Sequence, residues 1–397
     1  MRVQLIYNPA AGQRDATKDL RKVIAFLESQ GWNVALRTTL GPGDAISYAR
    51  EAAANGYDMA VAVGGDGTLG EVATGLAHSD CAMGVLPIGT GNVWAHMLGL
   101  PVWTLRRRSA LMDAAHILVD GRPCRIDLGK VGDRYFLLWS GIGFDAQIAH
   151  DVEPHREVRR NLGNLAYYVT AIALSLRLRG TRVTVTIDGQ TVRQRALLIV
   201  VSNAQLYGRS WRLAPQAQLD DGLLETYIFK GSNTLDALRH FVLLMQGKHI
   251  GDPRVETYRA KHIEIRAETP LPLHTDGDPA GSTPATITVV PKALDVIVPA
   301  WASGSLFQDG GFSDSASLML EEQPSLAQRI AARLRYERER ARSAQQHLRN
   351  AGGRVLGARE RARSARERAR GGRERRREKG ERVRNDGGRR FRFPPWR

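Results

Sequence analysis

The chain has 397 residues, 43% of them apolar, which is enough for more than one hydrophobic core and predicts two or three domains. Its two cysteines, Cys81 and Cys124, exclude a disulfide framework and a C-x-x-C zinc site, which fits a reducing cytosol. The formal charge of +16 comes from residues 325–397, which hold 25 Lys and Arg against 8 Asp and Glu, whereas the rest is nearly neutral.

The first part of the chain alternates apolar runs with amphipathic patterns. In chain order these are RVQLIY, KDLRKVIAFLESQG, NVALRTT, GDAISYAREAAANG, MAVAVG, TLGEVATGLA, CAMGVLPIGTG and NVWAHMLG. Strand and helix patterns that alternate in this way predict a parallel sheet with helices on both faces, and ligands bind such a sheet at the carboxyl ends of its strands. We predict this α/β domain to span residues 1–120.

The residue composition and the pattern of apolar positions change from about residue 121. Short stretches rich in β-branched residues, such as RVTVTIDG, QRALLIVVSN and HIEIRAE, are separated by turn residues and predict a mainly antiparallel domain over residues 121–302. Two helical patterns interrupt it, around residues 160–178 and 234–247. Residues 303–324 are rich in Gly, Ser and acidic residues and predict a flexible linker.

Residues 325–397 form an Arg-rich tail. Its first part has Glu and Arg at helical spacing, and after Leu356 it is nearly devoid of apolar residues, so we expect a partial helix followed by disorder. Three interpretations are open: binding to anionic lipid, non-specific binding to nucleic acid, or a solvated extension with no dedicated role.

The predicted strands of the first domain end in four similar loops. They read YNPAAG (7–12), RTTLGPGDA (37–45), GGDGTLGE (64–71) and LPIGTGN (86–92), and all should meet at one edge of the sheet. Together they offer main-chain amide groups, the hydroxyl groups of Thr39, Thr68 and Thr90, and the carboxylate of Asp66. This combination favours a nucleoside triphosphate with magnesium.

Two other nucleotide-binding classes fit less well. Gly65, Gly67 and Gly70 satisfy G-x-G-x-x-G, but in dinucleotide-binding domains these glycines follow the first strand, whereas here they follow the third. The chain has no G-x-x-x-x-G-K-[ST], which excludes a P-loop NTPase. No histidines have a metal-ligand spacing such as H-x-x-x-H, so we expect no zinc.

The segments NPAAG, GGDGTLGEV and LPIGTGN resemble the catalytic domain shared by diacylglycerol kinases, sphingosine kinases and soluble bacterial lipid kinases. The resemblance continues through SNAQLYGRSWRLAPQAQLDDGLLETYIF (202–229) and DGDP (276–279), and it covers residues 1 to about 300. It implies an ATP-dependent kinase that phosphorylates a lipid hydroxyl, with diacylglycerol as the leading acceptor and phosphatidic acid as its product. The first domain would bind ATP and the second would face the lipid.

The resemblance also implies roles for individual residues. Asp278 would be the general base, with Asp276 as its alternative, and Asp66 would act near the phosphates and magnesium. A structural Mg²⁺ would be held by the Asp221 side chain and the main chains of Gln218 and Leu223. The implied ATP contacts are Asn8, Pro9, Ala10, Ala11, Gly12, Thr39, Gly65, Asp66, Gly67, Thr68, Leu69, Gly70, Glu71 and Thr90.

Three departures from the family pattern keep other functions open. The family usually has Glu where this chain has Asp278, Asn is common at position 70, and many diacylglycerol kinases carry Asp at position 93, which is Val here. The alternatives are a kinase for a long-chain base or another lipid, an enzyme similar to NAD kinase, and a nucleotide- or lipid-binding protein with weakened catalysis. A homodimer is also possible.

The distribution of apolar residues in the sequence also predicts the cellular location of the protein. A strand pattern within the first residues argues against a secretory signal, and the longest apolar run, residues 165–176, is shorter than the roughly 20 residues of a membrane-spanning helix. We therefore expect a cytoplasmic protein that reaches its lipid substrate peripherally, at the inner face of the membrane.

Overall fold

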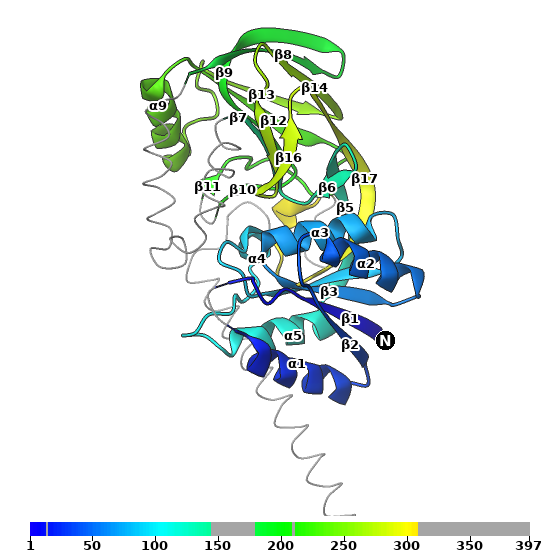
Figure 1. Ribbon diagram of the computed structural model, residues 1–397. Coiled ribbons are helices and arrows are strands. Elements are labelled where there is room, and N and C mark those ends of the chain that lie inside the picture. The colour runs from blue at the N-terminus through cyan, green and yellow to red at the C-terminus, as the bar shows by residue number, and fades with distance from the viewer. Residues whose placement is uncertain (13–14, 144–178, 209–210, 309–397) are drawn as a thin grey trace, which may run out of the picture. The chain divides into compact units, whose positions relative to one another are not determined.

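The computed structural model describes residues 1–12, 15–143, 179–208 and 211–308 (Figure 1). The helix predicted around residues 160–178, the linker beyond residue 308 and the Arg-rich tail lie outside the described residues. All the described residues belong to one compact unit, Met1–Ser313.

The N-terminal part contains the predicted parallel sheet, in the order β4-β3-β1-β2. Its strands are β1 (Arg2–Tyr7), β2 (Asn33–Thr38), β3 (Met59–Gly64) and β4 (Ala82–Pro87). The helices are α1 (Thr17–Ser29), α2 (Asp44–Ala54), α3 (Asp66–Leu76), α4 (Val93–Leu98) and α5 (Ala110–Asp120).

Helices cover both faces of this sheet (Figure 1). Leu20 of α1 and Leu111 of α5 share one buried cluster with Leu5 of β1, whereas Ala49 of α2 and Val72 of α3 belong to another. Because β1 pairs with β2 on one side and β3 on the other, the chain reverses its winding direction between β1 and β3. Ligands of such sheets bind at this switch point, so the loops after these two strands are where a ligand is expected.

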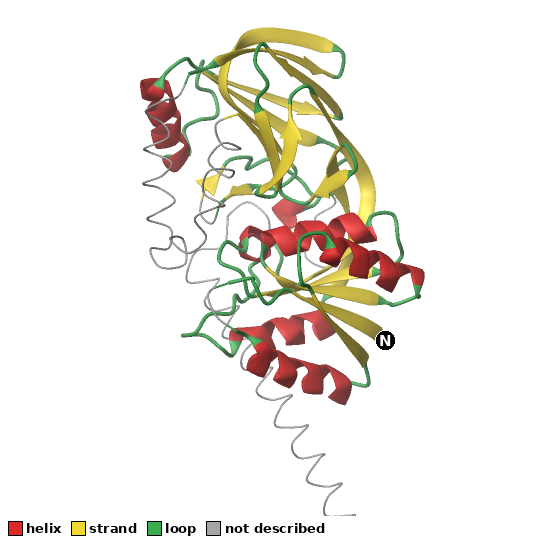
Figure 2. Ribbon diagram, in the orientation of Figure 1, coloured by secondary structure: helices red, strands yellow, loops and turns green. Residues whose placement is uncertain are grey.

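The second part is β-rich and its strands pair antiparallel with one another (Figure 2). Its strands are β5 (Arg122–Val131), β6 (Arg134–Phe136), β7 (Trp139–Gly143), β8 (Thr181–Ile187), β9 (Gln190–Ser202), β12 (Leu224–Lys230), β13 (Val255–Ala260), β14 (His262–Ala267), β15 (Pro272–Thr275), β16 (Asp278–Ser282) and β17 (Ala285–Val298), with a separate pair β10 (Leu206–Tyr207) and β11 (Trp211–Arg212). The predicted fold class, a parallel α/β part followed by a mainly antiparallel β part, is confirmed.

The 14-residue strand β17 joins the two parts. Ile287 at its start packs in the core of the β-rich part, and Val296 near its end packs with the α/β helices and pairs parallel with Met83 of β4. The next described residues stay on this core: Leu306 and Phe307 are 1% and 3% exposed. The predicted boundary at residue 302 therefore lies within a segment that packs on a core to which both parts contribute, and Leu306 accepts a hydrogen bond from Leu219 of the β-rich part (2.7 Å).

Two further expectations concern helices and cysteines. The helix expected at residues 234–247 is α9 (Thr234–Met245), and the side chain of Asn233 caps its N-terminus. Cys81 and Cys124 are free thiols. Within the described ranges, no helix combines the length and apolarity needed to cross a bilayer.

Candidate active site

The loops that follow β1, β3 and β4 touch through their main chains. A methyl group on Gly12 would lie 2.2 Å from the carbonyl oxygen of Ile88, and one on Gly89 would lie 2.4 Å from the Cα atom of Gly65. Ordinary van der Waals contact begins near 3.4 Å, so these loops can approach each other only because both positions are glycine. Three of the four loops that were predicted to meet at one edge of the sheet are therefore in contact.

The edge of the sheet at which these loops meet is called the rim here. Two carboxylates of α3 connect it to neighbouring helices. Asp66 accepts hydrogen bonds from the amide groups of Val93 (3.0 Å) and Trp94 (3.2 Å) at the start of α4. Glu71 accepts them from Gly43 (2.9 Å) and from Ala45 (3.2 Å) at the start of α2, which brings in the fourth loop. Both carboxylates therefore cap helices other than their own, as acidic side chains commonly do at helix N-termini.

Burial raises the pKa of Asp66, and the amide hydrogen bonds from α4 oppose that rise. A carboxylate held by several amide groups is well placed to fix a loop. The roles expected for Asp66 and Glu71 at the ATP phosphates remain predictions, whereas their bracing of the loops is visible in the structure.

Helix α3 begins directly at the meeting point of the loops. Its N-cap is Gly65, which has no side chain to cap the first turn. Exposed amide groups and the positive end of the helix dipole attract anions to such a position. The start of α3 is therefore a position on this rim whose local electrostatics favour an anion such as a phosphate group.

The other residues predicted to contact ATP divide by exposure. Asn8 donates from Nδ2 to Oγ1 of the buried Thr68 (2.9 Å), and the main-chain amide of buried Thr39 donates to the carbonyl of Tyr7 (2.9 Å), so these residues hold the loops in place. Leu69 packs in the core. The residues that are exposed or half-buried on the rim are Pro9, Ala10, Ala11, Gly12, Gly65, Gly67 and Thr90, whereas Gly70 is buried.

The segment TDGD forms a tight hairpin turn between β15 and β16. Thr275 pairs with Asp278, and the two central residues, Asp276 and Gly277, have φ values of 52° and 94°. Two positive φ values are typical of a type I′ turn, for which Asp-Gly is a preferred sequence. The turn places two carboxylates next to α3, on residues 276 and 278.

Asp276 is buried and acts as an anchor. Its carboxylate accepts hydrogen bonds from the amide groups of Leu137 (2.8 Å), Leu138 (2.9 Å) and Trp139 (3.1 Å). Burial raises the pKa of Asp276 to about 7; the three hydrogen bonds oppose this rise, and the nearby charge of Asp66 adds to it. A methyl group on Gly70 would lie 3.1 Å from its Oδ2, so Asp276 packs directly against α3.

Asp278 differs from Asp276 in exposure. Its side chain is 39% exposed, and its Oδ2 would lie 3.1 Å from a methyl group on Gly67, in the first turn of α3. Arg134 of β6 lies 3.6 Å from the same oxygen and donates to the carbonyl of Pro279 (2.8 Å). The partly exposed carboxylate of the turn thus lies beside the first turn of α3. No motif in the sequence pointed to Arg134.

Comparison with known proteins identifies the family. The profile of the diacylglycerol kinase catalytic domain matches residues 2–131, and that of the YegS C-terminal NAD kinase beta sandwich-like domain matches residues 140–298. The diacylglycerol kinase of Bacillus subtilis strain 168 is 31% identical over 300 residues, 75% of this chain and 96% of that protein. The chain belongs to the diacylglycerol kinase family. The family assigned from the sequence motifs is therefore confirmed.

Other members show the same relationship. The diacylglycerol kinase of Staphylococcus aureus strain RF122 is 29% identical over 300 residues, 75% of this chain and 92% of that protein. The crystal structure of a diacylglycerol kinase from Bacillus anthracis superposes with a TM-score of 0.62 at 27% identity, and the match covers 75% of this chain and 97% of that one. The two-part architecture is thus shared with solved members of the diacylglycerol kinase family.

The magnesium ligands implied by the family resemblance form a turn in which the acidic side chain is already bound. The carboxylate of Asp221 is 5% exposed; it accepts a hydrogen bond from the amide of Leu223 (3.0 Å) and pairs with the guanidinium group of Arg259. Arg259 also lies 2.9 Å from Glu225, and Gln218 donates to the carbonyl of Phe307 (3.4 Å). Among the described residues, no cluster of three or more acidic, His or Cys side chains could hold a metal.

This arrangement does not suit Mg²⁺, which is bound by free oxygen ligands. In this chain a guanidinium group supplies the positive charge at Asp221. The assignment of Gln218, Asp221 and Leu223 to a metal site remains a prediction, and no step of the chemistry below depends on it.

Proposed function

We propose that this protein transfers the γ-phosphoryl group of ATP to the free hydroxyl of diacylglycerol and forms phosphatidic acid. The family supports an ATP-dependent lipid kinase, and the relatives named diacylglycerol kinase support the acceptor. The observation that carries the proposal is the partly exposed carboxylate of Asp278 beside the first turn of α3, where the glycine loops meet.

In this proposal the main-chain amide groups of the glycine loops and of α3 hold the triphosphate. Phosphoryl transfer needs mainly correct positioning and neutralisation of charge. Mg²⁺ bound with ATP would supply part of that neutralisation. Asp66 and Glu71 contribute by fixing the helices and loops around the phosphates, through the hydrogen bonds described above.

Asp278 then accepts the proton of the lipid hydroxyl while the hydroxyl oxygen attacks the γ-phosphorus in line, the bond from the γ-phosphorus to the β-phosphate oxygen breaks, and ADP leaves. Asp276 is a poor choice for this step because it is buried and its oxygens bind three amide groups. Arg134 would hold the Asp278 carboxylate in position from the side. The difference in exposure between the two carboxylates therefore favours Asp278 over Asp276 as the base in this proposal.

The test is transfer of labelled phosphate from ATP to lipids in uncharged detergent micelles. Diacylglycerol should be labelled, and Asp278→Asn should lower kcat by about 10²- to 10⁴-fold, the usual contribution of a general base. Sphingosine and NAD serve as alternative acceptors in the same assay. Preferential labelling of either acceptor, ATP binding without transfer to any acceptor, or full activity of Asp278→Asn would contradict the proposal.

We also propose that the protein works at the cytoplasmic face of the membrane, because its proposed acceptor is a membrane lipid. Its peripheral attachment, a contribution of the Arg-rich tail through anionic lipid or nucleic acid, and a homodimer all remain predictions from the sequence.

A further inference from the structure

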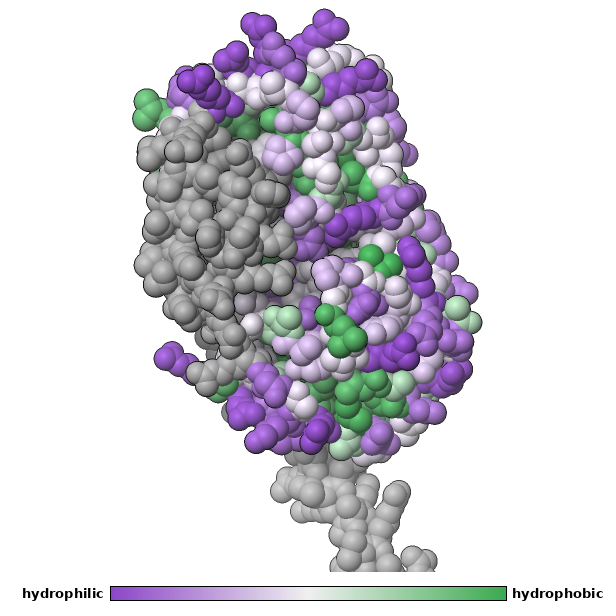
Figure 3. Space-filling view, in the orientation of Figure 1, coloured by the Kyte–Doolittle hydropathy of each residue, from purple (hydrophilic) through white to green (hydrophobic). Residues whose placement is uncertain are grey.

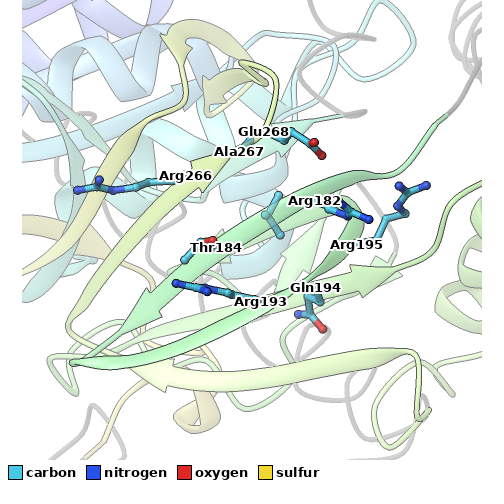
Figure 4. A pocket seen from close by; sticks show the side chains of 9 residues that line it. Arg182, Thr184, Arg193, Gln194, Arg195, Arg266, Ala267 and Glu268 are labelled. Carbon is cyan, nitrogen blue, oxygen red and sulfur yellow. The ribbon is translucent and has the colours of Figure 1, made fainter.

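A groove far in sequence from the candidate active site is lined by arginines. It has a volume of about 570 Å³ and lies on β8, β9 and β14 of the β-rich part (Figure 4). Its charged lining residues are Arg182, Arg193, Arg195, Arg266 and Glu268. In the described part of the chain, four positive charges thus share one groove with a single carboxylate.

The strand register places these arginines on one face of the sheet. Val183 and Val185 of β8 point into the core, so Arg182 and Thr184 point to the opposite face. Arg195 lies directly opposite Arg182, while Arg193 and Arg266 lie on either side of Thr184. In Figure 4 the side chains of Arg182 and Arg195 lie next to each other, whereas Arg193 and Arg266 lie toward the other end of the groove, apart from each other.

This arrangement is unfavourable without a counter-ion. Like charges directly opposite one another on neighbouring strands destabilise a sheet. None of the four arginines forms an ion pair with a carboxylate in the described part of the chain, whereas Glu264 on the same face pairs with His262 at 3.1 Å. All four arginines are exposed, so an external anion can reach them.

Guanidinium groups bind phosphate oxygens with two parallel hydrogen bonds. Arg193 and Arg266 are two strands apart, roughly 10 Å, so a phosphate group between them is within reach of both side chains. Thr184 offers a hydroxyl group between the two arginines. Among the described residues, no aromatic side chain lines the groove to stack on a base, which disfavours single-stranded nucleic acid.

An exposed apolar helix begins next to the groove. The amide of Gly231 donates to the carbonyl of Arg195 (3.2 Å), and α9 starts three residues later at Thr234. Several of its apolar side chains are exposed, among them Leu235 (76%), Leu238 (57%) and Met245 (59%). Basic residues beside exposed apolar ones are typical of proteins that bind the surface of an anionic membrane.

We propose that this groove, defined by Arg182, Arg193, Arg195 and Arg266, binds the phosphate headgroups of anionic phospholipids and docks the protein on the membrane. The inference extends the proposed function, since a kinase for a membrane lipid must reach its substrate at that surface. Figure 3 shows hydrophilic residues gathered over the β8 and β9 end of the β-rich part, which is consistent with an exposed charged surface there.

The test is flotation of the full chain with vesicles, either of phosphatidylcholine alone or with phosphatidylglycerol added. Arg193→Gln combined with Arg266→Gln should weaken binding to the anionic vesicles by about 25-fold, at about fivefold for each basic residue near the surface. High salt should remove the difference. Replacing the same two residues by Lys should retain most of the binding, because the charge is kept.

The matched control is Arg21→Gln combined with Arg50→Gln, which removes two exposed charges from the α/β part and should leave flotation unchanged. The tail is identical in all variants. Because flotation requires neither ATP nor turnover, its result is independent of whether the protein phosphorylates diacylglycerol. Circular dichroism establishes that each variant is folded.

Three outcomes would overturn the inference. The first is unchanged flotation of the folded glutamine variant, and the second is an equal loss in the control variant. The third is a loss of binding to inorganic phosphate or to an RNA oligonucleotide while flotation stays unchanged, which would assign the groove to a free anion or to nucleic acid.

Discussion

Replacing Gly89 by Ala should separate the two glycine loops that form the proposed phosphate site. The added methyl group would lie 2.4 Å from the Cα atom of Gly65, 3.0 Å from its nitrogen and 2.9 Å from Oδ1 of Asn92. Two of these three atoms belong to the main chain, so no side-chain rotation can relieve the contacts. One of the loops must move.

The size of the movement follows from the shortfall in contact distance. Ordinary contact begins near 3.4 Å, so the Gly65 loop must retreat by about 1 Å. A displacement of about 1 Å in a site that works by positioning costs on the order of 100-fold in rate. Overpacking should also lower the free energy of unfolding by about 1–3 kcal/mol.

The assay is kcat/KM for ATP-dependent labelling of diacylglycerol in uncharged micelles, together with thermal unfolding. Gly41→Ala is the matched control, because Gly41 lies on the same rim with open space around it and without a positive φ. Gly89→Ala should lose about 100-fold in kcat/KM, whereas the control should remain close to the unaltered protein. Equal activity of the two variants would refute the view that loop contact positions the phosphates.

Three further changes test individual carboxylates. Asp276 has a pKa raised from 3.8 to about 7, so between these pH values the folded state binds one more proton than the unfolded state. The free energy of unfolding should therefore fall by at most about 4 kcal/mol as the pH rises from about 4 to about 7. Urea unfolding should show this decrease with pH in the unaltered protein and not in Asp276→Asn. Arg259→Met removes the cationic partner of the buried carboxylates of Asp221 and Glu225, so the free energy of unfolding should fall by about 3–5 kcal/mol. Mg²⁺ should raise the melting temperature of this variant only. If a chelator lowers the melting temperature of the unaltered protein, a metal ion is bound there instead. Asp66→Asn removes one of the two carboxylate oxygens that accept hydrogen bonds from the α4 amide groups, so it should lower the free energy of unfolding by about 1–2 kcal/mol and weaken ATP binding. If turnover is lost while the melting temperature and ATP binding stay unchanged, Asp66 takes part in the chemical step itself.

Much of the fold and of the loop geometry could be predicted from the sequence because the signals are local. Alternating strand and helix patterns determined the parallel sheet, and the carboxyl ends of parallel strands lie at one edge whatever the details of packing. The glycines of the rim mark positions where main chains touch, as Gly12 and Gly89 do. The Asp-Gly pair at 276 and 277 is likewise a local signal for a tight hairpin.

The partners of the acidic residues could not be predicted, because they come from distant parts of the chain. Asp66 meets the start of α4, Glu71 meets the start of α2, and Asp276 meets residues 137–139. A motif shows that a carboxylate is present without showing which amide groups or cations surround it. For the same reason Arg134 and Arg259 were missed, since each acts through an acid far away in sequence.

The contact between the hairpin and α3 accounts for two of the departures from the family pattern together. Gly67 and Gly70 are three residues apart and share one face of α3. Each would place a methyl group 3.1 Å from a carboxylate oxygen, Gly67 from Asp278 and Gly70 from Asp276. A larger residue at position 70 would need the space that Asp276 occupies. Because neither glycine has a Cβ atom, the hairpin lies close to the helix, and a side chain as short as Asp278 still reaches the start of α3. The glycine at position 70 and the aspartate at position 278 are therefore compatible with one catalytic geometry, which supports an active kinase over a protein that has lost its chemistry.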